Sequence, residues 1–316
     1  MNRPVNIKRF FRYLTSRILA DVFFLAGGVY VLKTLLRNKK VLIILNYHNF
    51  SKYNNYNIKR GSILETGYAK SFEKQIRFLR RHFNFCYPEE FYGANCRSSI
   101  NLLITFDDGY KDNFDIALPV LSRNNASTIF FLTTSFIGTE NWLWHDKLRF
   151  LVSIGEFDQK KAEDILLEIN AGINPARDTV DNVNNSFPIN PPKRIMMNWD
   201  EVAEIHKSGF SLGSHTENDS NLDQLDYHAQ LSEINHSIEI ISVKTGSKCK
   251  YIAYPNGLFN DSTLRIARDQ EIEFGFSVIP GINKKNTDKL IMKRIGASAS
   301  DKKSFLLFKI FISVFR

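Results

Sequence analysis

Residues 100–110 read Ile-Asn-Leu-Leu-Ile-Thr-Phe-Asp-Asp-Gly-Tyr. The apolar run before Thr105 has the length of a buried strand, and Gly109 would let the chain turn away where that strand ends. Asp107 and Asp108 close the strand, and at a strand end both carboxylates can reach one cavity. Because like charges repel, one of them is stable only beside a cation or when protonated. The pair therefore predicts a division of labour, in which one Asp binds a metal and the other acts as a base on water. For a lone Asp-Asp-Gly, the alternative is a strand followed by an ordinary turn.

The composition indicates a folded, basic protein of 316 residues, long enough for one large domain or two small ones. Its hydrophobic content of 43% supports a sizeable core. The formal net charge of +9 is compatible with anionic membrane surfaces, anionic glycans or nucleic acid. We expect no nucleic-acid partner, because the chain carries no zinc-finger or RNA-binding signature. The three cysteines, Cys86, Cys96 and Cys249, follow no metal-binding spacing, and so sparse a set mildly favours a reducing compartment.

Strand-like and helix-like segments alternate along most of the chain, which predicts a parallel sheet or barrel of the α/β class. Apolar runs expected to form strands lie at 41–45, 100–104, 127–133, 210–215, 251–254 and 275–278. Segments with helical spacing lie at 72–82, 115–125, 225–244 and 261–270, and another helix starts near 198. His48 follows the first of these strands, where α/β sheets place their sites. Taken alone, such a His is more often a hydrogen-bonded structural residue.

In the two terminal segments, basic and apolar stretches alternate. In residues 1–40, the uncharged stretch 22–32 is shorter than the roughly 20 residues of a bilayer span. No small-residue cleavage site follows it, so we expect no cleaved signal peptide. Either an interfacial membrane helix or a helix packed on the domain fits this segment. For the tail, residues 301–316, the alternatives are interfacial membrane binding and a last helix docked on the N-terminal one.

Residues 141–195 interrupt the alternation and are predicted to form a helical insertion over one mouth of a barrel domain that spans 41–300. Asn141-Trp142-Leu143-Trp144-His145-Asp146 opens a helix, and a second helix is expected near 160–169. Trp142 and Trp144 could stack on a sugar ring, although burial against the barrel is the alternative for at least one of them.

Three motifs together make the chain resemble the polysaccharide deacetylases, carbohydrate esterase family 4. They are Thr-Phe-Asp-Asp-Gly at 105–109, Leu-Gly-Ser-His-Thr-Glu-Asn-Asp-Ser-Asn-Leu at 212–222 and Ala-Tyr-Pro-Asn-Gly at 253–257. The resemblance covers about residues 41–296. It implies a distorted (β/α)7-type barrel with N- and C-terminal helices added, and a hydrolase that removes acetyl groups from sugars with a divalent metal, such as zinc, manganese or another first-row ion.

The resemblance also implies the central roles. Asp107 would be the general base, and Asp108 and His215 would be metal ligands. Asp219 stands where the family has its second metal-binding His. Carboxylate oxygen binds zinc, manganese or magnesium, so we expect Asp219 to serve as the third ligand. The alternative is that Asp219 caps the following turn and metal binding is weak or lost. In that case the protein would be a catalytically impaired glycan-binding or scaffold protein.

Further roles follow from the same resemblance. The backbone amide of Asn256 would help to hold the tetrahedral oxyanion, and Arg294 could supply positive charge near the base. The family's C-terminal Leu-x-x-His acid is missing, because no His follows His236. Tyr47-His48 matches a Tyr-His motif of the poly-N-acetylglucosamine deacetylases, so His48 is expected to be the acid. Residues expected to contact the saccharide are Tyr110, Tyr254, Pro255, Trp144 and Arg294.

The prediction is therefore a metal-dependent deacetylase of an N-acetylated sugar in a glycan or in a lipid-linked or nucleotide-linked saccharide. Without a cleavable signal, we expect it in the cytoplasm or at the inner membrane face, with peripheral membrane contact through both termini. An exported, anchored deacetylase of a finished polysaccharide is the alternative.

Overall fold

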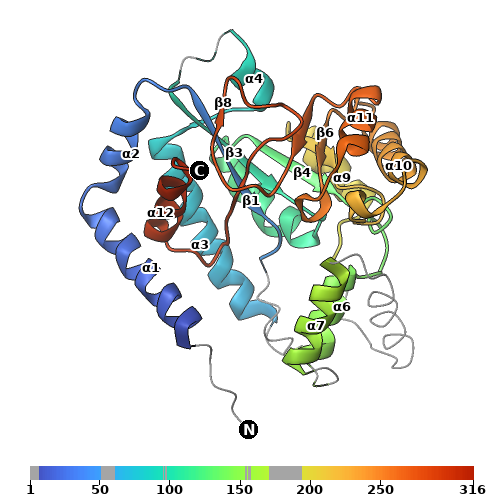
Figure 1. Ribbon diagram of the computed structural model, residues 1–316, viewed down its shortest axis with the longest axis horizontal. Coiled ribbons are helices and arrows are strands. Elements are labelled where there is room, and N and C mark those ends of the chain that lie inside the picture. Colours follow the sequence, from blue (N-terminus) through green and yellow to red (C-terminus); the bar gives the residue numbers. More distant parts are fainter. Residues whose placement is uncertain are drawn as a thin grey trace.

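A curled sheet of mainly parallel strands forms the centre of this computed structural model, which describes residues 7–50, 61–94, 96, 98–153, 155, 158–170 and 194–316 (Figure 1). The strands are β1 (Val41–Tyr47), β2 (Asn84–Phe85), β3 (Ile100–Phe106), β4 (Thr128–Leu132), β5 (Ser211–Ser214), β6 (Tyr251–Ala253), β7 (Phe274–Phe276), β8 (Asn283–Lys284) and β9 (Ile295–Gly296). They pair in the order β7-β6-β5-β4-β3-β1-β8, with β2 beside β3 and β9 beside β1. The β1–β8 pair is antiparallel, whereas the other pairs are parallel.

The register between β1 and β3 aligns the ends of the two strands. Every residue of both strands is buried, as expected for parallel strands covered on both faces. Val41 pairs with Ile100, and Tyr47 pairs with Phe106. His48 and Asp107 therefore leave the sheet side by side at its carboxyl edge.

One short segment near the C-terminus joins the two sides of the curled sheet. Met292 forms a parallel bridge with Phe276 of β7, and Ile295 in β9 pairs with Leu45 of β1. Arg294 lies between these two contacts, so it is held inside the curl. This architecture confirms the distorted α/β barrel predicted from the sequence.

The helices surround the sheet, and several of the predicted ones appear within a few residues of their expected bounds. Helices and single turns in chain order are α1 (Ile7–Leu25), α2 (Gly28–Leu36), α3 (Gly61–His82), α4 (Pro88–Tyr92), the π-turn η1 (Asn113–Ala117), α5 (Leu118–Arg123), α6 (Trp144–Ser153), α7 (Gln159–Asn170), α9 (Trp199–Lys207), η2 (Leu222–Gln224), α10 (Tyr227–Thr245), η3 (Pro255–Gly257), α11 (Asp261–Asp269) and α12 (Lys303–Ser313). The helix predicted at 115–125 differs, because it opens with a π-turn ahead of Pro119, which has no N–H to donate.

The C-terminal helix α12 is docked on the N-terminal helix α1, which was one of the two alternatives for the tail (Figure 1). The ring of Phe23 lies 4.4 Å from that of Phe311 and 6.0 Å from that of Phe308, and Ser304 donates a hydrogen bond to Asp21. Among the described residues, no single helix is long and apolar enough to cross a membrane. The segments 15–25 and 28–36 reach that length and composition only as a pair bent by 79°.

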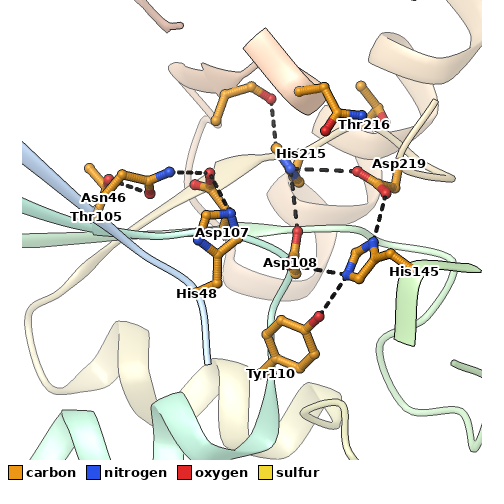
Figure 2. A network of polar contacts seen from close by, with 12 residues as sticks. Asn46, His48, Thr105, Asp107, Asp108, Tyr110, His145, His215, Thr216 and Asp219 are labelled. Carbon is orange, nitrogen blue, oxygen red and sulfur yellow. Dashed lines mark hydrogen bonds and ion pairs between the residues drawn. The ribbon is translucent and has the colours of Figure 1, made fainter. Parts of the chain in front are cut away.

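The insertion contains the two predicted helices, α6 and α7, while residues 171–193 lie outside the described part of the chain. Trp144, Leu148 and Leu151 of α6 pack against Ala162 and Ile165 of α7. The insertion thus has a small core of its own, and the first turn of α6 reaches the carboxyl edge of the sheet (Figures 1 and 2).

Candidate active site

Asp107 is held at the end of β3 by Asn46 of β1 (Figure 2) and by Arg294, which directly precedes β9. Asn46 Nδ2 donates to its Oδ2 at 2.9 Å, and Arg294 Nη1 donates to its Oδ1 at 2.7 Å. His48 Nε2 lies 3.9 Å from the same Oδ2. The carboxylate is 2% exposed, whereas the side chain of His48 is 53% exposed. A buried base and a more exposed imidazole therefore lie next to each other.

The charges around Asp107 keep it ionised. Burial by itself raises the pKa of this carboxyl, but the charges of Arg294, His215 and His48 more than offset burial, so the pKa lies well below its usual range. Arg294 is itself 2% exposed and is fixed by a second bond from Nε to the Ser277 carbonyl at 2.8 Å. Asp107 is thus oriented and unprotonated, as a general base must be.

Asp108 belongs to a separate cluster, although it follows Asp107 directly. Its backbone is left-handed (φ 77°), which Asp tolerates better than most residues. This conformation directs its side chain toward His215 and Asp219 (Figure 2). His215 Nε2 lies 3.4 Å from Asp108 Oδ1 and 3.6 Å from Asp219 Oδ1. One ligand atom from each of the three residues falls within 4.8 Å of the others, so the structure brings together the three side chains expected to hold a metal.

The ring orientation of His215 suits a metal ligand. Its Nδ1 lies 2.8 Å from the carbonyl of Ala253. Because a carbonyl can only accept, Nδ1 carries the proton and Nε2 presents its lone pair to Asp108 and Asp219. Metal-binding histidines are commonly oriented by a carbonyl in this way. The bond also ties β6 to the cluster.

Several non-glycine residues around the cluster have strained, left-handed backbone conformations. Thr216, Asp219 and Asn256 have φ values of 63°, 57° and 53°, and a β-branched residue such as Thr216 adopts this region rarely. Such conformations persist where the surrounding structure enforces them, often at functional sites. Asn256 lies in the turn after Ala253, and its side chain donates to Asn221 at 2.9 Å. The turn expected to carry the oxyanion-binding amide is therefore connected to the His215 side of the site.

His145, at the start of α6, is a member of the site that sequence reasoning missed. Its Nε2 lies 3.9 Å from Asp108 Oδ2, and its Nδ1 lies 3.8 Å from Asp219 Oδ2 (Figure 2). Burial lowers its pKa, and the carboxylates of Asp146 and Asp108 oppose that effect only in part. The signal was a His-Asp pair at the start of an inserted helix, but nothing in its spacing connects it to the motifs elsewhere.

The five residues expected to contact the saccharide have buried side chains, and their contact with a sugar stays a prediction. Tyr254 is fully buried and donates to the Leu290 carbonyl at 2.9 Å. Tyr110 is 1% exposed and its hydroxyl is engaged by His145 and Asp146. The three others are also buried: Trp144 in the core of the insertion, Pro255 in its turn and Arg294 against Asp107. The motifs identify the positions of these residues in the sequence, but the side chains themselves are packed in the protein interior.

Comparisons with known proteins agree with this fold. The family model for polysaccharide deacetylase matches residues 94–275. A poly-β-1,6-N-acetyl-D-glucosamine N-deacetylase of Staphylococcus aureus is 22% identical over 270 residues, which cover 78% of this chain and 75% of that protein. Since the family model matches more than half of the chain, the chain belongs to the polysaccharide deacetylase family. It is thus placed among the hydrolases that deacetylate carbohydrates.

Solved structures support the fold independently. The Streptococcus pyogenes deacetylase PplD in complex with acetate has a TM-score of 0.59 at 20% identity, covering 86% of this chain and 99% of that one. IcaB from Ammonifex degensii has a TM-score of 0.56 at 18% identity, covering 85% of this chain and 96% of that one.

Proposed function

We propose that the protein is a metal-dependent hydrolase that removes the acetyl group from an N-acetylated sugar. The observation that carries this proposal is the separation of two adjacent carboxylates into two environments. Asp107 is paired with Arg294, whereas Asp108 faces His215 and Asp219. One position thus offers an ionised base, and the next offers a ligand.

The residues present fit a divalent metal. The donor set of one imidazole nitrogen and two carboxylate oxygens is suitable for zinc, manganese or another first-row ion. Asp108 Oδ2 is buried, and no described residue donates a hydrogen bond to it, which is costly unless a cation is nearby. When bound, such an ion would act as a Lewis acid that acidifies water and polarises the acetyl carbonyl.

The chain's own residues account for the proton transfers. Asp107, oriented by Asn46 and Arg294, takes a proton from the attacking water, whose oxygen forms a bond with the carbonyl carbon. The backbone amide of Asn256 stabilises the charge that develops on the carbonyl oxygen. His48, exposed and 3.9 Å from Asp107, gives a proton to the departing nitrogen. The C–N bond then breaks, and the products are acetate and the free amino sugar.

The substrate class follows by analogy with the curated relative that acts on poly-β-1,6-N-acetylglucosamine. We propose an N-acetylated amino sugar in a glycan or in a lipid-linked or nucleotide-linked saccharide. The test measures acetate release from each of these three forms, before and after removal of metal by a chelator. We expect the chelator to abolish acetate release, and zinc or manganese to restore it.

Asp108→Ala is expected to lose both tightly bound metal and acetate release. Removing a residue that hydrogen-bonds to a metal ligand typically lowers metal affinity or activity by about 10–100-fold. Removing a direct ligand should therefore lower metal affinity by more than about 100-fold. Metal content by elemental analysis and acetate release are measured on the same sample. A wild-type protein without metal or acetate release would contradict the enzyme proposal and favour a glycan-binding or scaffold role.

We also propose that α1 and α2 lie on an anionic membrane surface, at the inner face as expected from the sequence. Their outward side carries exposed apolar side chains, including Val22 (58%), Leu25 (85%) and Tyr30 (76%). The basic residues Arg37 and Lys39 follow on the exposed end of the pair. Both helices lie at the periphery of the molecule (Figure 1). Exposed apolar residues beside basic ones are typical of interfacial helices.

The double substitution Val22→Glu and Leu25→Glu should weaken binding to phosphatidylglycerol-containing vesicles by at least about 10-fold, since burial of each side chain contributes roughly 1.5–3 kcal/mol. Vesicle flotation measures this. Val243→Glu, at a 74% exposed position on α10, is the matched control and should bind as the wild type does. Equal binding of all three proteins would contradict the proposal.

A further inference from the structure

Position 219 holds Asp where the family has its second metal-binding His, but the insertion places another His, His145, next to the same cluster. His145, on α6, is enclosed with 17% of its side chain exposed and lies against both carboxylates of the cluster, Asp108 and Asp219. We propose that His145 Nδ1 is the second imidazole ligand of the metal, supplied by the insertion instead of the turn after β5. This inference rests on the proposed function, since it concerns the same ion.

Hydrogen bonds around His145 determine which ring nitrogen is free. The Tyr110 hydroxyl has a single proton, which it donates to Asp146 Oδ2 at 2.8 Å. The other Asp146 oxygen accepts from Arg149 Nη1 at 3.2 Å, so both oxygens of Asp146 act as acceptors. The 2.9 Å contact between Tyr110 and His145 Nε2 is therefore one in which Nε2–H donates. Nδ1 is left with a lone pair.

That lone pair points at another acceptor. His145 Nδ1 and Asp219 Oδ2 are 3.8 Å apart, too far for a hydrogen bond. Asp108 Oδ2 lies 3.9 Å from Nε2 of the same ring, also too far for a hydrogen bond, and is buried without a hydrogen-bond donor among the described residues. Acceptors that converge in this way are stabilised by a cation between them. The contact between His145 Nδ1 and Asp219 Oδ2 comes from outside the three-residue cluster, and it too calls for a positive charge at this point.

The distances are close to those of ligands that share an ion. Two ligands about 2.0–2.1 Å from zinc in a tetrahedron lie roughly 3.4 Å apart. The contacts of His215 Nε2 with Oδ1 of Asp108 and Oδ1 of Asp219 measure 3.4 and 3.6 Å. His145 Nδ1 lies 3.8 Å from the other Asp219 oxygen, Oδ2, at the edge of the three-residue group. With His145, the set contains two imidazoles and two carboxylates, and its formal charge of −2 balances a divalent ion.

The parallel between the two histidines supports the assignment. His215 donates through one nitrogen to the Ala253 carbonyl and presents the other to the cluster. His145 donates through one nitrogen to Tyr110 and presents the other to Asp219. Outer partners that fix the ring and tautomer are a regular feature of metal-binding histidines. Tyr110 is accordingly assigned as a positioning residue for His145.

The test counts imidazole ligands in the zinc-loaded, full-length protein by X-ray absorption spectroscopy. We expect two in the wild type and one in His145→Gln, together with at least a 10-fold loss of zinc affinity. His236→Gln is the matched control, because His236 is 56% exposed and pairs with Glu217; it should retain two. The double variant Asp219→His, His145→Gln should regain two imidazoles, since it restores the family's own ligand at position 219.

Tyr110→Phe provides a second variant in case His145→Gln does not fold. It removes the hydroxyl that orients His145, so we expect two imidazoles with zinc affinity lowered by about 10-fold. One imidazole in the zinc-loaded wild type would overturn the assignment of His145 and leave the deacetylase proposal intact if acetate is still released. A wild type that binds no zinc or manganese would overturn both.

Discussion

Asp107→Asn is expected to lower kcat for acetate release by about 10²–10⁴-fold, the usual contribution of a positioned general base. The Asn side chain can still accept the 2.7 Å hydrogen bond from Arg294. It leaves the Arg294 charge unpaired and loses the second acceptor for Asn46, so circular dichroism first checks that the variant is folded. The Asn side chain cannot take a proton from water. Because Asp107 is not in the cluster with His215 and Asp219, metal affinity should change far less than the rate. Steady-state acetate release and a metal titration on the same sample measure the two effects.

A matched substitution separates catalysis from a general effect of removing one charge. Asp269→Asn makes the same change at a 56% exposed position in an ion pair with Arg265, and its rate should equal that of the wild type. If Asp107→Asn retained a rate within a few-fold of the wild type, Asp107 would not be the base.

Arg294→Leu should have the largest effect on stability, a loss of about 3–5 kcal/mol in the free energy of unfolding near neutral pH. The reason is that it leaves Asp107 buried without its cation. It also removes the hydrogen bonds that Arg294 donates to Asn46 and Ser277. Urea unfolding followed by circular dichroism measures the difference. Arg77→Leu, which removes an exposed pair with Glu73, is the control and should cost less than about 1 kcal/mol.

The same substitution has a predicted pH dependence. The folded-state pKa of Asp107 lies below its ordinary value of 3.8. A carboxylate with a lowered pKa contributes stability that is present above its unfolded-state pKa and lost as pH falls toward the folded-state pKa. In the variant, the unpaired carboxyl would be protonated more readily. The difference between the two proteins should therefore shrink as the pH falls toward and below about 4. A cost for Arg294→Leu that equals that of Arg77→Leu at pH 7 would contradict this account.

Much of the fold could be predicted from continuous apolar runs. The segments 41–45 and 100–104 were predicted as buried strands, and they form β1 and β3 in register. The cluster of Asp108, His215 and Asp219 was also expected, because the motifs that contain these residues resemble those of the polysaccharide deacetylases. Parallel strands bring their carboxyl ends to one edge of the sheet.

The remaining parts of the site depend on contacts between distant segments. His145 reaches the cluster because the inserted helix folds back onto the sheet edge, and no periodicity in residues 141–153 specifies that. Arg294 meets Asp107 because the segment 292–296 joins both sides of the curl. The buried positions of Tyr110 and Tyr254 follow from packing, which a motif does not encode. Similarly, a basic apolar tail has the same composition whether it docks on a helix or on a membrane, and α12 docks on α1.

The central claim is that one metal ion in the Asp108 cluster enables acetate release. It is tested most directly by adding zinc or manganese stepwise to the metal-free protein and measuring bound metal and acetate release at each step. The substrate is an N-acetylglucosamine oligomer or its lipid-linked form. Our account predicts that activity rises with bound metal and saturates at one ion per chain, and that Asp108→Ala shows neither. Acetate release that is equal in the metal-free and metal-loaded protein, or metal binding without any acetate release, would contradict it.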